Sequence, residues 1–158
     1  MKLGIIAVGK ARKGPESLLT ETYLDRLPHS AGLSEVESRL TAGPQRTLDE
    51  GRRIMSVLDG TGQDSLLVCL DPFGRDISSE ALADFIHNSR QDRHPACFFA
   101  IGGADGHSAE VLGRAHQKFA FGTATWPHLL CRAMLAEQLY RAEMILKGHP
   151  YHRKGPAQ

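Results

Sequence analysis

Two stretches of the chain are apolar almost from end to end: SLLVCLD at residues 65–71 and PACFFAI at residues 95–101. Each has the length of a strand, and a strand that lacks the usual apolar and polar alternation must be covered on both faces. Helices that connect parallel strands provide this cover, because each connection crosses one face of the sheet. The two stretches therefore favour a parallel sheet within a layered α/β fold.

The rest of the chain alternates between segments of strand character and segments of helix character. We expect strands at residues 2–8, 33–40, 65–71, 95–101 and 118–124. We expect helices at residues 14–27, 47–60, 78–89, 108–117 and 129–148, with Ser78 and Ser108 as N-terminal caps. Residues 40–47 and 72–76 are expected to form a loop and a turn. The 158 residues then make one α/β domain, residues 1–158, with a mostly parallel sheet flanked by helices.

Charge and composition narrow the class of protein. The net charge of +1 gives no overall attraction to nucleic acid, but the chain is basic from Arg132 onward, which suggests a local anionic partner or a solvated helix face. No apolar run approaches the roughly 20 residues of a membrane span, so we expect a cytoplasmic protein without a membrane partner. The cysteines Cys69, Cys97 and Cys131 lie in apolar sequence and are expected to be reduced, buried thiols.

Three predicted strand ends carry unusual sequence: DPFG at residues 71–74, IGGADG at 101–106 and TATWPH at 123–128. The carboxyl ends of parallel strands meet at one edge of a sheet, which is where ligands bind in open α/β folds. Glycines in the second segment allow close backbone approach to a ligand, although a tight structural turn is the more common explanation. The segment matches neither the dinucleotide pattern nor a phosphate-binding loop.

The sequence HPYHR at residues 149–153 places two histidines, a tyrosine and an arginine at the C-terminal end. These side chains are suited to holding an anion and stacking on a flat ring. A metal site at His149 and His152 is disfavoured because no further ligand stands nearby. Patterns in the residues alone leave an enzyme and a binding module open.

Taken in order, five segments resemble a single family: MKLGIIAVGK at the start, LDPFG, IGGADGHS, TATWPHLLCRAMLAEQLYRA and HPYHR. They are similar to the ribosomal large-subunit pseudouridine N3-methyltransferase H family, whose members are small SPOUT methyltransferases. The resemblance implies an α/β sheet with a deep trefoil knot over about residues 70–148 and a substrate-contacting tail at 149–158. It also implies a homodimer that methylates N3 of a pseudouridine in 23S rRNA within the 70S ribosome. The methyl donor would be S-adenosylmethionine, and no metal is expected.

The same resemblance implies the residues of the site. The cofactor would be bound by Leu70, Gly102, Gly103, Phe121, Gly122, Thr123, Ala124, Thr125 and Trp126. The catalytic candidates are Tyr151, His152 and Arg153, with Arg132 and His128 as second candidates. In this scheme Tyr151 contacts the base, His152 accepts the N3 proton, and Arg153 holds a phosphate or developing charge. We expect the tail of one subunit to complete the pocket of the other.

The chain departs from the family pattern at two places. It has Ala104-Asp105 where the family has Pro-Glu, and Trp126 where the family has Leu. Two other interpretations stay open at this point: a SPOUT enzyme that acts on another RNA or another atom, and a ribosome-associated protein that binds RNA without turnover. Methyl transfer and the identity of the modified nucleotide distinguish them.

Overall fold

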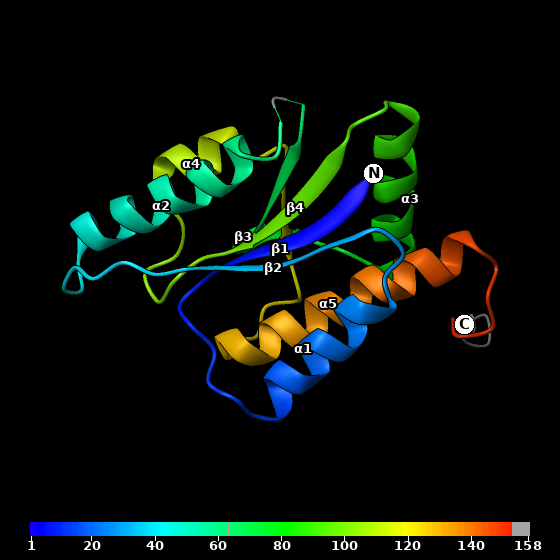
Figure 1. The fold of residues 1–158 in the computed structure, drawn as a ribbon, viewed down its shortest axis with the longest axis horizontal. Helices are drawn as coiled ribbons and strands as arrows, with labels where there is room; N and C mark the ends of the chain where they lie inside the picture. The colour runs from blue at the N-terminus through cyan, green and yellow to red at the C-terminus, as the bar shows by residue number, and fades with distance from the viewer. Residues whose placement is uncertain (63, 153–158) are drawn as a thin grey trace.

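The computed structural model describes residues 1–62 and 64–152 as a five-stranded sheet with helices on both faces (Figure 1). The strands are β1 (Lys2–Val8), β2 (Ser30–Val36), β3 (Leu66–Asp76), β4 (Ala96–Ile101) and β5 (Gln117–Ala120). The helices are α1 (Pro15–Arg26), α2 (Pro44–Asp59), α3 (Ser79–Gln91), α4 (Ala109–Arg114) and α5 (His128–Leu146). The strand order is β2-β1-β4-β3-β5, and these strands pair in parallel. The predicted α/β class is confirmed.

The central strands are apolar on both sides because each side faces its own core. On β1, Leu3, Ile5 and Ala7 pack in the core formed with α1, α3 and α5. The alternate residues Ile6 and Val8 pack in the second core, with α2 and α4. The same division holds along β4, which explains why the two apolar stretches lack polar alternation. Figure 1 shows α2 and α4 together on one side of the sheet and α1 and α5 on the other.

Several predicted boundaries were wrong. Strand β5 ends at Ala120, so residues 121–124 are not part of it, and helix α4 ends at Arg114, three residues before its predicted end. Strand β2 begins at Ser30 and ends at Val36, so residues 37–40 are not part of it. Helix α2 begins at Pro44, inside the predicted loop, because a proline in the first turn needs no hydrogen-bond acceptor for its nitrogen. Strand β3 continues to Asp76 through the predicted turn, with a break in register between Leu70 and Arg75 where it pairs with β5.

The two predicted helix caps are confirmed. The side chain of Ser78 accepts a hydrogen bond from the backbone N–H of Ala81, and that of Ser108 accepts one from Val111. Both caps lie just after the sheet edge that carries the unusual sequences. Within residues 1–62 and 64–152, no helix has the combination of length and apolar character that crossing a membrane requires. The knot implied by the family resemblance stays a prediction.

Candidate functional site

A cavity of about 270 Å³ lies at the carboxyl ends of β3 and β4, closed on one side by the segment between β5 and α5. Its volume is near the lower limit of small-molecule sites, roughly 300 Å³. Eight of the nine predicted cofactor residues line it: Leu70, Gly102, Gly103, Phe121, Gly122, Ala124, Thr125 and Trp126. Thr123 is not among the lining residues. The three strand ends therefore converge as expected, and the cofactor role of these residues stays a prediction.

The glycine loop after β4, residues 102–106, is a tight turn. The backbone N–H of Gly106 donates to the carbonyl of Gly103 at 3.0 Å, and Gly106 has a φ of 78°. A Cβ on Gly102 would lie 2.9 Å from the backbone of Gly106, and one on Gly103 would lie 2.7 Å from Oε2 of Glu50. The turn alone thus explains the glycines, while it also leaves backbone groups at the cavity wall.

An arginine of α2 holds this loop from outside. Nη2 of Arg46 lies 2.9 Å from Oδ2 of Asp105, and its Nε lies 3.6 Å from Oε1 of Glu50. Burial raises the pKa of the Glu50 carboxyl, and Arg46 partly offsets this shift. Asp105 therefore has a structural partner and ties the loop to α2.

His107 was not singled out from the sequence, yet it lines the cavity. Its Nε2 lies 3.0 Å from the carbonyl oxygen of Leu70, and its buried Nδ1 has no hydrogen-bond partner among the described residues. Burial lowers the pKa of the imidazole below its usual value. A neutral ring that donates from Nε2 to Leu70 fits this geometry, and it fixes the carbonyl at the end of β3. In the sequence, the only signal for His107 was its place directly after the glycine loop.

The segment between β5 and α5 forms the remaining wall. Nε1 of Trp126 donates to the carbonyl of Phe121 at 2.9 Å, and the indole is 40% exposed. The backbone N–H of Gly122 donates to Oδ1 of Asp76, and Gly122 has a φ of 76°. His128, in the first turn of α5, also lines the cavity. It is the only described catalytic candidate that does so.

Arg132 lies in the interior, one turn further along α5. Its Nη2 donates to the carbonyls of Val8 and Gly9 at 2.9 and 2.8 Å, and its Nη1 lies 2.7 Å from Oε1 of Glu35. The same carboxylate oxygen accepts the backbone N–H of Ala11. These contacts favour a structural role, in which Arg132 fixes α5 to the ends of β1 and β2. Its catalytic role stays a prediction.

The tail packs on its own helices in this structure. The Tyr151 hydroxyl lies 3.0 Å from Oε1 of Glu137, and its ring meets that of Tyr140 edge to face with centroids 4.9 Å apart. Burial raises the pKa of the phenol, so it stays protonated at neutral pH. Nε2 of His152 lies 3.1 Å from Oε1 of Glu80 on α3. Arg153, the third catalytic candidate, and residues 154–158 lie outside the described residues.

The tail and the cavity are separate within one chain. Tyr151 contacts Glu137, which follows His128 by about two and a half turns, or roughly 14 Å along the axis of α5. Figure 1 shows the tail leaving the far end of α5, away from its first turn. The structure therefore does not bring Tyr151 and His152 to the cavity of their own chain.

The cavity suits S-adenosylmethionine better than a phosphorylated cofactor or a metal. Its walls combine apolar side chains such as Leu70, Phe121 and Trp126 with the backbone of Gly102 and Gly103. Among the described residues, no lysine or arginine lines it. Apolar walls and accessible backbone are what an adenine ring without phosphates requires. Within residues 1–62 and 64–152, no three potential metal ligands cluster. Burial raises the pKa of Cys131, the cysteine at the cavity, to about 11, so it stays a thiol.

Comparison with known proteins gives consistent matches over the whole chain. The sequence model of a family described as "Predicted SPOUT methyltransferase" matches residues 1–152. Ribosomal RNA large subunit methyltransferase H of Paramagnetospirillum magneticum is 48% identical, covering 97% of this chain and 99% of that protein. The proteins of the same name from Rhodospirillum rubrum and Methylobacterium nodulans are 44% and 43% identical, covering 97% and 99% of this chain and 99% and 100% of those proteins.

Proposed function

Because the chain belongs to the SPOUT methyltransferase family, we propose that it is an S-adenosylmethionine-dependent methyltransferase acting on ribosomal RNA of the large subunit. The observation that carries this proposal is the glycine-lined, largely apolar cavity where three strand ends converge. At a finer level, we propose that the acceptor is N3 of a pseudouridine in 23S rRNA within the assembled 70S ribosome. A cytoplasmic location follows from that substrate.

The cavity residues would bind and orient the two reactants. Gly102, Gly103 and the segment 121–126 would hold the cofactor, which supplies an activated methyl group on its sulfonium. His107 would keep the Leu70 carbonyl fixed at the cavity wall, since its Nε2 already lies 3.0 Å from that oxygen. N3 of the base must lie in line with the methyl group and the sulfur that leaves it, and the proton on N3 must pass to a nearby acceptor. His128 stands at this wall, and His152 is the candidate from the tail.

We also propose that the active unit is a homodimer in which the tail of one subunit reaches the cavity of the other. An apolar groove of about 560 Å³ between α1 and α5, lined in part by Leu19, Tyr23, Leu130 and Met134, supports self-association. Leu19, one of these lining residues, is 47% exposed. A second subunit on this groove would cover these side chains and give the tail a route to a cavity that it does not reach within its own chain.

The first experiment measures methyl incorporation from labelled S-adenosylmethionine into 70S ribosomes that lack the modification, with free 23S rRNA as a parallel substrate. We expect incorporation into the particle, and mass mapping that assigns the methyl group to a pseudouridine. Methyl groups on another nucleotide would indicate a SPOUT enzyme of different specificity. Cofactor binding without transfer to either substrate would contradict the proposed function and favour an RNA-binding protein without turnover.

A complementation experiment tests the shared site. One variant, Gly102→Ala, alters the cavity, and the other, Tyr151→Phe with His152→Ala, alters only the tail. Mixed dimers that contain one subunit of each kind combine an intact cavity with an intact tail across the interface. We expect mixed dimers to recover activity that neither variant dimer has alone. If mass spectrometry demonstrates mixed dimers and they recover no activity, each tail acts at the cavity of its own chain.

A further inference from the structure

Phe73 is the most exposed large apolar side chain among the described residues, at 95%. Single exposed apolar residues are common on soluble proteins, so exposure alone indicates little. The surroundings of Phe73 are more specific. The backbone N–H of Phe73 donates to Oδ1 of Asp71 at 2.8 Å, and Pro72 restricts the backbone between them. The ring is therefore presented by an ordered turn of β3.

The residue after Phe73 prevents this turn from folding back into the core. A Cβ on Gly74 would lie 2.7 Å from the backbone of Phe119 and 2.8 Å from that of Lys118. The chain at Gly74 thus lies directly against β5, and the core position beneath it is already filled by the buried ring of Phe119. Phe73 itself lies 95% exposed and is not among the residues that line the adjoining cavity.

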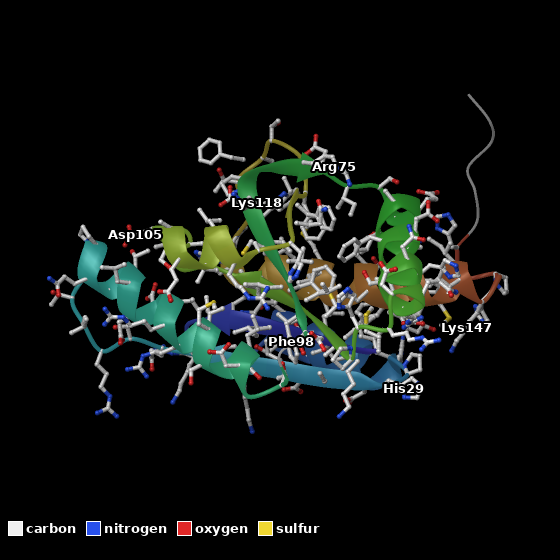
Figure 2. All side chains as sticks on the ribbon, turned by 90° about the horizontal axis from the view of Figure 1, so that it is seen from above. His29, Arg75, Phe98, Asp105, Lys118 and Lys147 are labelled. Carbon is white, nitrogen blue, oxygen red and sulfur yellow. The ribbon has the colours of Figure 1, made fainter. Side chains whose placement is uncertain are left out.

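Two exposed cations, Arg75 and Lys118, lie near this turn. Arg75 follows it on β3 and pairs with Phe119 of β5, next to Lys118. Neither cation forms an ion pair with the described residues, although the guanidinium of Arg75 lies 5.8 Å from the centroid of the Phe119 ring. The nearby Asp71 and Asp76 each accept a backbone N–H. Figure 2 shows Arg75 and Lys118 on the same side of the molecule, opposite His29. An exposed aromatic ring with cations near the same turn complements a base and its adjacent phosphates.

The turn also adjoins the candidate active site. Asp71 and Pro72 line the cofactor cavity, but Phe73 does not. The turn therefore borders the cavity, and the ring is placed to contact a nucleotide that lies outside the cavity, next to the one inside it. A second copy of the chain is a less suitable partner for Phe73, because the apolar groove between α1 and α5 does not include it.

We propose that Phe73 stacks on an unpaired base of the ribosomal RNA beside the methylated nucleotide, while Arg75 and Lys118 contact its phosphates. This inference rests on the proposed function and names a substrate contact that the cavity does not contain. Its role is to position the RNA, so it affects binding of the ribosome and not binding of the cofactor.

Substitutions at Phe73 test whether the aromatic face matters. We expect Phe73→Ala to weaken binding and raise KM for unmodified 70S ribosomes by about tenfold, within the range found for the loss of one stacked base. The cofactor Kd, kcat and the sedimentation coefficient should stay unchanged. Phe73→Tyr should retain affinity because it keeps the ring, and Phe73→Leu should behave like Phe73→Ala. Wild-type affinity in Phe73→Leu, or a change in oligomeric state in Phe73→Ala, would overturn the proposal.

The cations are tested by the salt dependence of ribosome binding. Each lost phosphate contact should reduce the slope of log affinity against log salt by about 0.7–0.9. We expect Arg75→Gln and Lys118→Gln to show this change, and Lys2→Gln, an exposed cation at the first residue of β1 and thus at the opposite end of the strands, serves as the matched control. Unchanged slopes for both variants would remove the phosphate contacts from the proposal.

The two proposals can fail separately. Wild-type protein that binds ribosomes but transfers no methyl group would contradict the proposed function, and ribosome affinity would still decide the role of Phe73. Active wild-type protein with an equally active Phe73→Ala variant, at limiting ribosome concentration, would overturn the stacking contact alone.

Discussion

At the scale of single residues, Gly102 is a position where the surrounding backbone leaves no room for a side chain. A Cβ would lie 2.9 Å from the carbonyl carbon and oxygen of Gly106. Both atoms belong to the backbone of the same turn, so neither can move aside without opening the loop. The position therefore demands glycine through close packing and not through an unusual φ.

This contact leads to the first prediction. We expect Gly102→Ala to displace the glycine loop and weaken S-adenosylmethionine binding by at least tenfold, measured by calorimetry. Gly113→Ala is the matched control, because Gly113 lies in α4 with nothing within 4 Å of an added Cβ. Alanine there should leave cofactor affinity unchanged and stabilise the helix by about 0.5–1 kcal/mol. A cofactor affinity in Gly102→Ala equal to that of the wild type would show that the glycine loop is not part of the cofactor site.

His107 gives a prediction about pH. Its pKa in the folded chain lies below the usual 6.5 because the ring is buried, so the unfolded chain binds a proton at a higher pH than the folded chain does. The neutral ring makes its full contribution to the free energy of unfolding above pH 6.5. This contribution is lost as the pH falls toward the pKa of the folded chain. We expect the thermal midpoint to fall between pH 7 and pH 5.5, and to fall less in His107→Gln, which keeps a donor for Leu70.

The difference in pH dependence between the wild-type protein and His107→Gln isolates the contribution of His107. The pKa of His116 is also lowered by burial, but this residue is present in both proteins and cancels in the difference. Identical pH dependence in wild type and His107→Gln would show that the folded imidazole accepts its proton at the ordinary pH.

At the scale of secondary-structure elements, Arg132 connects three of them. It lies on α5, bonds the carbonyls at the end of β1, and pairs with Glu35 of β2. These acceptors lie at the sheet edge where the loops of the candidate site begin. The contact therefore sets where the first turn of α5, with His128, stands relative to the strand ends.

Removing the guanidinium of Arg132 should lower the stability of the fold. We expect Arg132→Met to lower the free energy of unfolding by about 3 kcal/mol, since the buried guanidinium is the donor to the carbonyls of Val8 and Gly9, and its removal leaves both acceptors without a partner. Arg132→Lys should recover only part of this loss, because one ammonium group cannot reproduce the fork of the guanidinium. Arg53→Met, which removes a pair on the exposed face of α2, is the control and should change little. Chemical denaturation measures all three, and an unaffected Arg132→Met would favour a role in substrate contact instead.

At the scale of the whole molecule, the separation of cavity and tail requires a partner if both act in one reaction. The groove between α1 and α5 offers an apolar surface for a second copy of the chain. Figure 1 shows α1 and α5 side by side on the same face of the sheet. A dimer through these helices would bury their exposed apolar residues.

We expect the wild-type protein to sediment as a dimer. Leu19→Asp or Met134→Asp, each of which puts a charge into the groove, should shift it to a monomer and abolish methyl transfer. Leu48→Asp, an exposed leucine on α2 outside that groove, should stay dimeric. A fully active monomeric variant would contradict the proposal that the site is shared between subunits.

The sequence by itself determined the layers of this protein. Uninterrupted apolar strands such as PACFFAI have only one stable environment, between two layers of helices, and Ser78 and Ser108 cap helices through contacts with residues three positions away. Local patterns of this kind do not depend on the rest of the chain. The family motifs also indicated which strand ends form the cavity, because parallel strands must end at a common edge.

Only the tertiary structure decided the partners of the polar side chains. The bond from His107 to Leu70 joins residues 37 positions apart, that from Arg132 to Val8 joins residues 124 apart, and the register break in β3 depends on pairing with β5. Such contacts are fixed by how the elements pack, and no local pattern encodes them. The same holds for Phe73: in the sequence it is one apolar residue in a turn, and its exposure follows from the close packing of Gly74 against β5.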